Sequence, residues 1–159
     1  MKLDLDRQEH GRSQLEISGN LELGLADGRT GRADLAGVLT VDNVASRFLL
    51  NGALRAEGLA ECGRCLREFS LVWKVPVEIM VLRDVDSDEG EGDSLVLHQK
   101  SGEADLSDPL RECAVLAFPL APLCDQECKG LCPSCGIDRN NGSCECAEED
   151  YDPRWEGLP

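Results

Sequence analysis

Apolar and polar residues alternate along much of the first half of the chain. In "SQLEISGNLELGL", residues 13–25, the apolar positions are Leu15, Ile17, Leu21, Leu23 and Leu25. Successive side chains of a strand point to opposite faces, so a period of two indicates a half-buried β-strand. The next residues, "ADGRTGRAD", are rich in turn formers and predict a loop.

Further strands are predicted at residues 35–44, 46–62 and 66–82. The second of these reads as one long strand or as two strands with a break near Asn51-Gly52. It and the third strand form a long antiparallel hairpin with Cys62 and Cys65 in the turn. Pro76 lacks the N–H that a sheet ladder needs, so it requires an edge strand or a bulge.

The hydrophobic period changes from two to that of a helix near residue 106. Leu110, Cys113, Ala114 and Ala117 fall on one helical face. A helix is therefore predicted over about residues 106–118, with Ser107 or Asp108 as N-cap, Pro109 in the first turn and Pro119 ending it.

These elements predict a mainly β (α+β) fold: an antiparallel barrel-like or sandwich domain with one C-terminal helix. Residues 84–93 form an acidic linker, and residues 94–99 form a short strand. The predicted division is a β domain with its closing helix over 1–122, a cysteine-rich extension over 123–146, and an acidic tail over 147–159.

Composition narrows the class of protein. Apolar residues make up 42% of the chain, which indicates a folded protein. The net charge of −15 opposes sequence-independent binding to nucleic acid, because phosphates are neutralised by basic patches. Neither a signal peptide nor an apolar stretch long enough to cross a membrane is evident, so we expect a cytoplasmic protein with reduced thiols.

Nine cysteines are the strongest chemical signal, and in a reducing compartment such a density favours metal over disulfides. "CPSCG" resembles a zinc knuckle, in which Gly136 allows the positive φ of the tight turn. "CEC" supplies two more thiols after eight residues. One predicted zinc site therefore comprises Cys132, Cys135, Cys144 and Cys146.

Cys62 and Cys65 need a second pair of thiols, and Cys124 with Cys128 is available for a second four-cysteine zinc site. A rival grouping joins Cys62 and Cys65 with Cys132 and Cys135. Cys113 is left over on the apolar helical face, where we expect a buried, inert thiol.

No catalytic residue emerges from the sequence. His10 and His98 have no identifiable nucleophilic partner, and no phosphate-binding loop or dinucleotide fingerprint is present. A zinc ion with four thiolates has no open position for water, so both sites are expected to be structural. The alternatives are thiol redox chemistry or metal handling through the Cys-x-x-Cys motifs, and an iron–sulfur cluster in place of zinc.

Three stretches also carry a family resemblance. "ECGRCLREF", the helix ending in "FPLAPLC", and "CKGLCPSCGIDRNNGSCEC" resemble the YceD family, the large ribosomal RNA subunit accumulation proteins. The resemblance covers roughly residues 15–146. The family tends to have Asn-Leu-Asn shortly after the "CG", whereas Arg139 stands here in place of the leucine.

The resemblance implies a non-enzymatic role in accumulation of the large-subunit (23S) ribosomal RNA. Combined with the acidity, it suggests an assembly factor that binds a basic ribosomal protein or a large-subunit precursor, without a small-molecule substrate. Arg64, Arg67 and Lys129 flank the cysteine turns and form a candidate basic spot for RNA. A zinc-ribbon adaptor for transcription is a further alternative.

Overall fold

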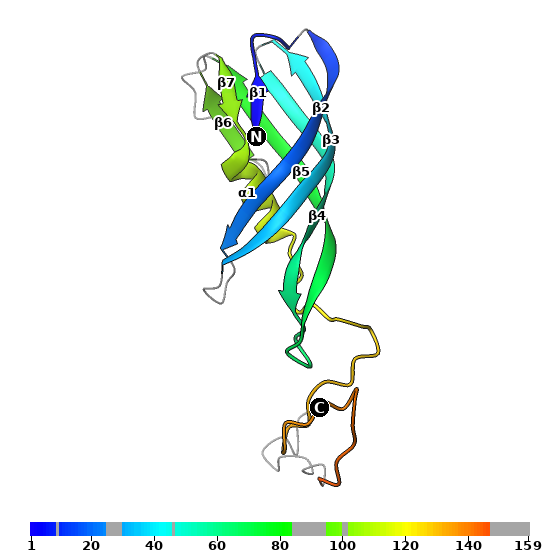
Figure 1. Cartoon of the computed structure of the whole chain (residues 1–159). Coiled ribbons are helices and arrows are strands. Elements are labelled where there is room, and N and C mark those ends of the chain that lie inside the picture. The colour runs from blue at the N-terminus through cyan, green and yellow to red at the C-terminus, as the bar shows by residue number, and fades with distance from the viewer. Residues whose placement is uncertain (9, 25–29, 46, 84–94, 100–101, 147–159) are drawn as a thin grey trace, which may run out of the picture.

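The computed structural model describes residues 1–8, 10–24, 30–45, 47–83, 95–99 and 102–146 (Figure 1). The elements are β1 (Lys2–Asp4), β2 (Gly11–Gly24), β3 (Thr30–Val44), β4 (Arg47–Glu61), β5 (Glu68–Arg83), β6 (Leu95–Gln99), β7 (Glu103–Asp105) and α1 (Ser107–Leu116). The predicted linker at 84–93, the predicted tail at 147–159 and the side chain of His98 lie outside this description.

A five-stranded sheet in the order β2-β3-β4-β5-β6 forms the body of the molecule. Its neighbours are antiparallel except β5 and β6, which pair in parallel. A second sheet consists of β1 and β7. The predicted mainly β fold with one helix is confirmed, and both sheets, as described, are open rather than closed into a barrel.

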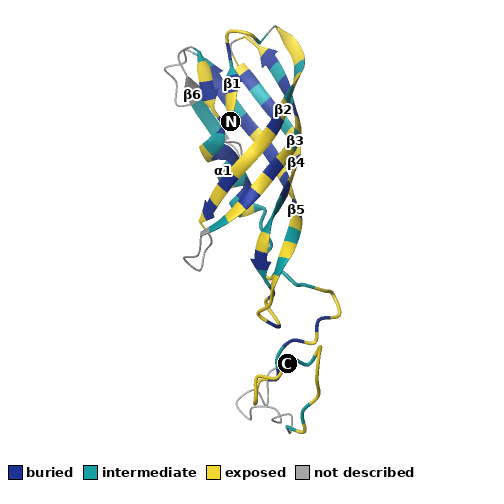
Figure 2. Cartoon of the chain, in the orientation of Figure 1, coloured by how far each residue is buried: buried dark blue, intermediate teal, exposed yellow. Residues whose placement is uncertain are grey.

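The helix α1 covers the open side of the curved sheet, because it packs against both β2 and β5. Figure 2 shows buried and exposed residues alternating along the strands, as the period of two predicts. Trp73 of β5 ties the helix to the sheet: its indole Nε1 donates to the Ala114 carbonyl at 3.2 Å, and its ring meets Phe118 edge-on with centroids 5.2 Å apart.

Two local predictions were wrong. The helix N-cap is Leu106, which makes no side-chain capping bond, instead of Ser107 or Asp108. The Ser107 N–H donates to Asp105 Oδ1 at 2.9 Å. The side chain that caps the first helical N–H therefore belongs to the residue before the N-cap. The loop predicted at 26–34 is too long, since β3 already begins at Thr30 and pairs with β2.

No break interrupts β4 at Asn51-Gly52, which remains paired on both sides. A Cβ on Gly52 would lie 3.0 Å from Leu39 Cδ2 and 3.3 Å from the Val38 carbonyl oxygen, so glycine allows the close approach of β3 and β4 there. Among the residues that the structure describes, Pro76 has a strand partner on one side only: it pairs with Ala53 of β4, and β6 accompanies β5 only over Ile79–Arg83. The edge position required by Pro76 is therefore observed.

Leu110→Ala is expected to destabilise the fold by about 2–5 kcal/mol, because Leu110 is 0% exposed in the core between α1 and the sheet. Leu116→Ala, at the 78% exposed end of the same helix, is the matched control and should cost about 0.5 kcal/mol or less. Urea unfolding followed by far-ultraviolet circular dichroism measures both. Equal losses for the two variants would contradict the packing described here.

Candidate metal centres

The β4–β5 hairpin projects beyond the other strands and carries Cys62 and Cys65 in its turn (Figure 1). The chain that follows α1 runs back to this tip, where the Gly63 N–H donates to the Pro122 carbonyl at 2.8 Å. A Cβ on Gly63 would lie 3.7 Å from that carbonyl oxygen. The cysteine-rich segment is thereby brought to the hairpin turn.

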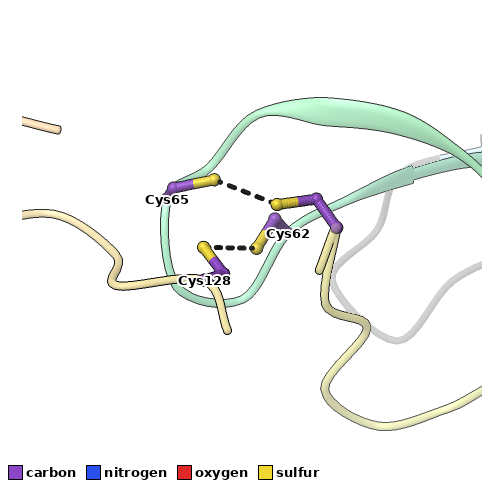
Figure 3. A group of neighbouring side chains, drawn as sticks. Cys62, Cys65 and Cys128 are labelled. Atoms are coloured by element: carbon purple, nitrogen blue, oxygen red, sulfur yellow. Dashed lines mark hydrogen bonds between the residues drawn. The ribbon is translucent and has the colours of Figure 1, made fainter. Parts of the chain in front are cut away.

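Four thiols meet at the hairpin tip, and we call this group the hairpin site. Its members are Cys62, Cys65, Cys124 and Cys128, whose Sγ atoms all lie within 4.8 Å of one another. The Cys62 and Cys128 sulfurs are 3.8 Å apart, and those of Cys65 and Cys124 are 3.6 Å apart (Figure 3). Two ligands come from the hairpin and two from the chain after the helix.

The hairpin site lies in an apolar setting. Cys62, Cys65 and Cys128 are buried, and Phe69, Leu123 and Leu131 pack around them. The Arg64 backbone N–H faces Cys62 Sγ at 3.5 Å. Such a shell excludes water from the thiols and fixes their positions, as a structural metal site requires.

A second group, the knuckle site, begins at Cys132, and three residues separate it from Cys128 of the hairpin site. Its members are Cys132, Cys135, Cys144 and Cys146, whose Sγ atoms also lie within 4.8 Å of one another. Cys132 is buried, Cys144 and Cys146 are half-buried, and Cys135 is exposed. The rival grouping of Cys62 and Cys65 with Cys132 and Cys135 does not occur, because the two pairs lie in different groups.

The two Cys-x-x-Cys turns share one backbone geometry. In each turn the first cysteine donates its N–H to the carbonyl five residues on, and its own carbonyl accepts the N–H of the residue four positions on. In the first turn these bonds are Cys62 N–H to Arg67 O at 2.9 Å and Leu66 N–H to Cys62 O at 3.0 Å. In the second they are Cys132 N–H to Ile137 O and Gly136 N–H to Cys132 O, both at 2.8 Å. The residue after each second cysteine has positive φ, 59° at Leu66 and 74° at Gly136. Gly136 predicts the turn at Cys132–Cys135. Leu66 gives no such signal for the turn at Cys62–Cys65, since leucine rarely adopts a positive φ.

One thiol in each group is poised to ionise. The pKa of Cys62 falls to about 6 because backbone N–H groups, first that of Cys124, donate to its sulfur. The pKa of Cys132 falls to about 6 for the same reason, through the N–H groups of Cys135 and Ser134. Hydrogen bonds to the charged form of a sulfur favour that form, so these two thiols ionise more readily than a free cysteine does.

Another thiol in each group resists ionisation. The Arg67 N–H lowers the pKa of Cys65, but burial and the neighbouring thiols outweigh it and raise that pKa to about 12. The pKa of Cys146 rises to about 12, first because of its hydrogen bonds with the thiols of Cys135 and Cys144. A bound divalent cation removes this conflict, since it displaces the remaining protons and stabilises all four thiolates.

The sulfur spacing fits a tetrahedral metal ion. With Zn–S bonds of about 2.3 Å, the edge of a tetrahedron of sulfurs is about 3.8 Å. Two of the sulfur pairs in the hairpin site, which are 3.6 and 3.8 Å apart, are close to this edge, and all pairs lie within 4.8 Å. All nine cysteines are free, and these separations far exceed the length of about 2.0 Å of a disulfide bond. Zinc at either site stays a prediction, and so does the division of the chain at residue 122.

The predicted basic spot lies around the hairpin site, and its two arginines contact residues of that site. Arg64 Nη1 donates to the Cys128 carbonyl at 2.8 Å. The pKa of Arg67 is raised, first by its hydrogen bond with the Cys124 thiol. The Arg67 guanidinium thus faces a sulfur of the site, and the Arg64 guanidinium faces a backbone carbonyl beside it. With a divalent metal the four thiolates would carry net negative charge, which both cations would offset. Binding of RNA by these residues and Lys129 stays a prediction.

Sequence reasoning missed Asn140 and Asp138. Asn140 Nδ2 donates to Cys128 Sγ at 3.5 Å, and Asp138 accepts bonds from the side chains of Asn140 and Asn141 at 2.6 and 2.7 Å. The sequence Asn140-Asn141-Gly142 is typical of a turn, and a turn does not by itself indicate a contact with a sulfur. Cys113 belongs to neither group and is half-buried instead of fully buried; burial raises the pKa of its thiol.

Among the residues that the structure describes, no helix has the length and apolar character needed to cross a membrane.

Comparison with known proteins identifies the family. The model of the "large ribosomal RNA subunit accumulation protein YceD" family matches residues 50–159. An uncharacterized protein of Mycobacterium tuberculosis is 31% identical over 121 residues, covering 76% of this chain and 58% of that protein. The chloroplastic YCED homolog 1 of Arabidopsis thaliana is 28% identical over 139 residues, covering 70% of this chain and 43% of that protein.

The chain therefore spans less than two thirds of the length of either relative. No solved structure matches it. The matched family region contains nearly all of the β4–β5 hairpin and every cysteine of both groups. The chain therefore belongs to the YceD family, whose members are described as large ribosomal RNA subunit accumulation proteins.

Proposed function

We propose that this protein is a non-enzymatic ribosome-assembly factor that promotes accumulation of the 23S ribosomal RNA in the cytoplasm. It does so by binding a basic ribosomal protein or a large-subunit assembly intermediate. Family membership carries the proposal. The Arabidopsis relative bears the same description in its name.

The charge of the chain favours a basic protein as the direct partner. It carries 31 acidic and 16 basic residues, a net charge of −15. Such a chain repels the phosphate backbone of naked RNA and attracts basic ribosomal proteins, which it can shield from premature RNA contacts.

The proposal includes two structural zinc ions, one bound at the hairpin site and one at the knuckle site. Four thiol ligands fill a tetrahedral coordination shell, so no position remains for a reactive water. The metal at the hairpin site would join the β4–β5 hairpin to the chain after α1, because each contributes two sulfurs. Its role is to hold the extension in one orientation for a partner.

Thiol redox chemistry is the competing function, and the acidic thiols of Cys62 and Cys132 give it some support. Burial argues against it, since these thiols are 0% and 3% exposed and a redox nucleophile must be accessible. Iodoacetamide separates the two functions. Structural zinc thiolates should resist alkylation until a chelator removes the metal, whereas catalytic thiols should react at once.

The assembly function is tested by binding at physiological salt. The reduced, metal-loaded protein is immobilised and offered large-subunit precursor particles, purified basic ribosomal proteins, and protein-free 23S RNA. We expect retention of precursor particles or of a basic ribosomal protein. Tight binding of RNA with no binding of ribosomal proteins would refute the proposed mechanism, and selective retention of RNA polymerase would favour a transcription adaptor.

A further inference from the structure

The loop of the knuckle site reaches across to the hairpin site. Asn140 lies between Cys135 and Cys144, which belong to the knuckle site. Its side-chain Nδ2 donates to Cys128 Sγ, a member of the hairpin site, at 3.5 Å. A residue whose position depends on one group of thiols thus contacts a sulfur of the other.

Three further hydrogen bonds hold Asn140 in this orientation, and two of them are made by its side chain. Its Oδ1 accepts the Lys129 backbone N–H at 2.8 Å. Its own backbone N–H and its Nδ2 donate to Asp138 Oδ1 at 2.9 and 2.6 Å. With the oxygen bound to a backbone donor, the amide nitrogen is left directed at the sulfur.

The backbone joins the two sites at the same place. Arg139 N–H donates to the Gly130 carbonyl at 2.9 Å, and Leu131 N–H donates to the Arg64 carbonyl at 3.1 Å. Gly130 has a φ of 72°, and a Cβ there would lie 3.0 Å from the Arg64 oxygen, so only glycine allows this approach. The backbone of residues 129–131 therefore makes hydrogen bonds with residues next to both sites.

An N–H donor to a thiolate favours the charged, metal-binding form of the sulfur and fixes its direction. Asn140 can supply this donor only while its loop is ordered. The loop has little apolar packing of its own, because residues 139–143 are exposed or half-buried, and its two ends carry cysteines of the knuckle site. The order of the loop therefore depends on what those cysteines bind.

We propose that Asn140 is a positioning residue that couples the two metal sites. Metal at the knuckle site fixes the loop, and the Asn140 amide then holds Cys128 for metal at the hairpin site. By linkage, each site binds metal more tightly when the other is filled. This inference rests on the metal sites of the proposed function.

The first test is Asn140→Ala in the full chain. We expect the affinity of the hairpin site for Zn²⁺, measured by competition with a chromogenic chelator, to fall about 10–100-fold, the usual effect of losing a partner of a metal ligand. With Co²⁺ in place of zinc, the thiolate charge-transfer band should shift. Asn141→Ala is the matched control, because the Asn141 side chain of the same loop donates to Asp138 Oδ2 at 2.7 Å and not to a sulfur.

The second test is a double-mutant cycle. Cys144→Ser with Cys146→Ser disables the knuckle site, and in that background Asn140→Ala should add no further loss at the hairpin site. Equal losses in both backgrounds, or none in either, would overturn the coupling. A chain that binds two metal ions with independent affinities overturns the coupling alone, whereas a folded chain that binds none overturns the metal sites as well.

Discussion

Cys128→Ser is expected to abolish metal binding at the hairpin site and to detach the extension from the β4–β5 hairpin. Cys128 is buried among the four thiols of that site, and its sulfur lies 3.8 Å from that of Cys62. Structural zinc binding contributes about 10–16 kcal/mol in small zinc domains, and the loss of one thiolate removes much of it. Native mass spectrometry should show one metal ion in place of two.

Cys113→Ser is the matched control, since Cys113 lies on α1 and belongs to neither group of thiols. It should keep both metal ions. Hydrogen exchange gives an independent measure: in Cys128→Ser, the Leu131 N–H should lose the protection given by its bond to the Arg64 carbonyl. Retention of two metal ions by Cys128→Ser would contradict the assignment of this ligand.

Removal of both metal ions by a chelator is expected to unfold residues 123–146 and to leave the β domain folded. Segments of fewer than about 40 residues seldom bury enough apolar surface to fold unaided and usually need metals or disulfides. Most of residues 133–146 are exposed (Figure 2). The core residues, by contrast, come from the strands and α1.

Hydrogen exchange measures this result residue by residue. The N–H groups of Cys132, Gly136 and Arg139, all bonded within the extension, should exchange rapidly without metal. The N–H groups of β3 and β4 should keep their protection. Cys132→Ser is the comparison variant, since it should disrupt the knuckle site without removing a ligand of the hairpin site. Full protection of the extension after metal removal would contradict the prediction.

The strands and their hairpins could be predicted because their signal is local. Alternation in β2 and the return of β5 after the Cys62–Cys65 turn are properties of neighbouring residues. The parallel pairing of β5 with β6 could not be predicted, since the alternation within each strand does not specify the direction of its neighbour. The prediction of the helix N-cap was wrong for a similar reason. Asp105 is the last residue of β7 and also accepts the first helical N–H, so one residue serves two elements.

The membership of the cysteine groups could largely be predicted by counting, because eight thiols in four pairs can form only a few sets of four. Spacing alone did not decide between Cys124 with Cys128 and Cys132 with Cys135 as partners of the hairpin turn. The structure separates them through backbone contacts, first that of Gly63 with Pro122. Asn140 could not be found, because its bond to Cys128 joins two irregular segments whose shapes carry no periodic signal.

The central claim is that the extension is held by two four-thiol metal sites, one of which joins it to the hairpin. The most direct measurement is the metal content of the purified, reduced chain by native mass spectrometry with elemental analysis. Two zinc ions per chain is the predicted result, and one ion confined to the knuckle site would refute the junction at the hairpin. A folded chain without metal would contradict the account.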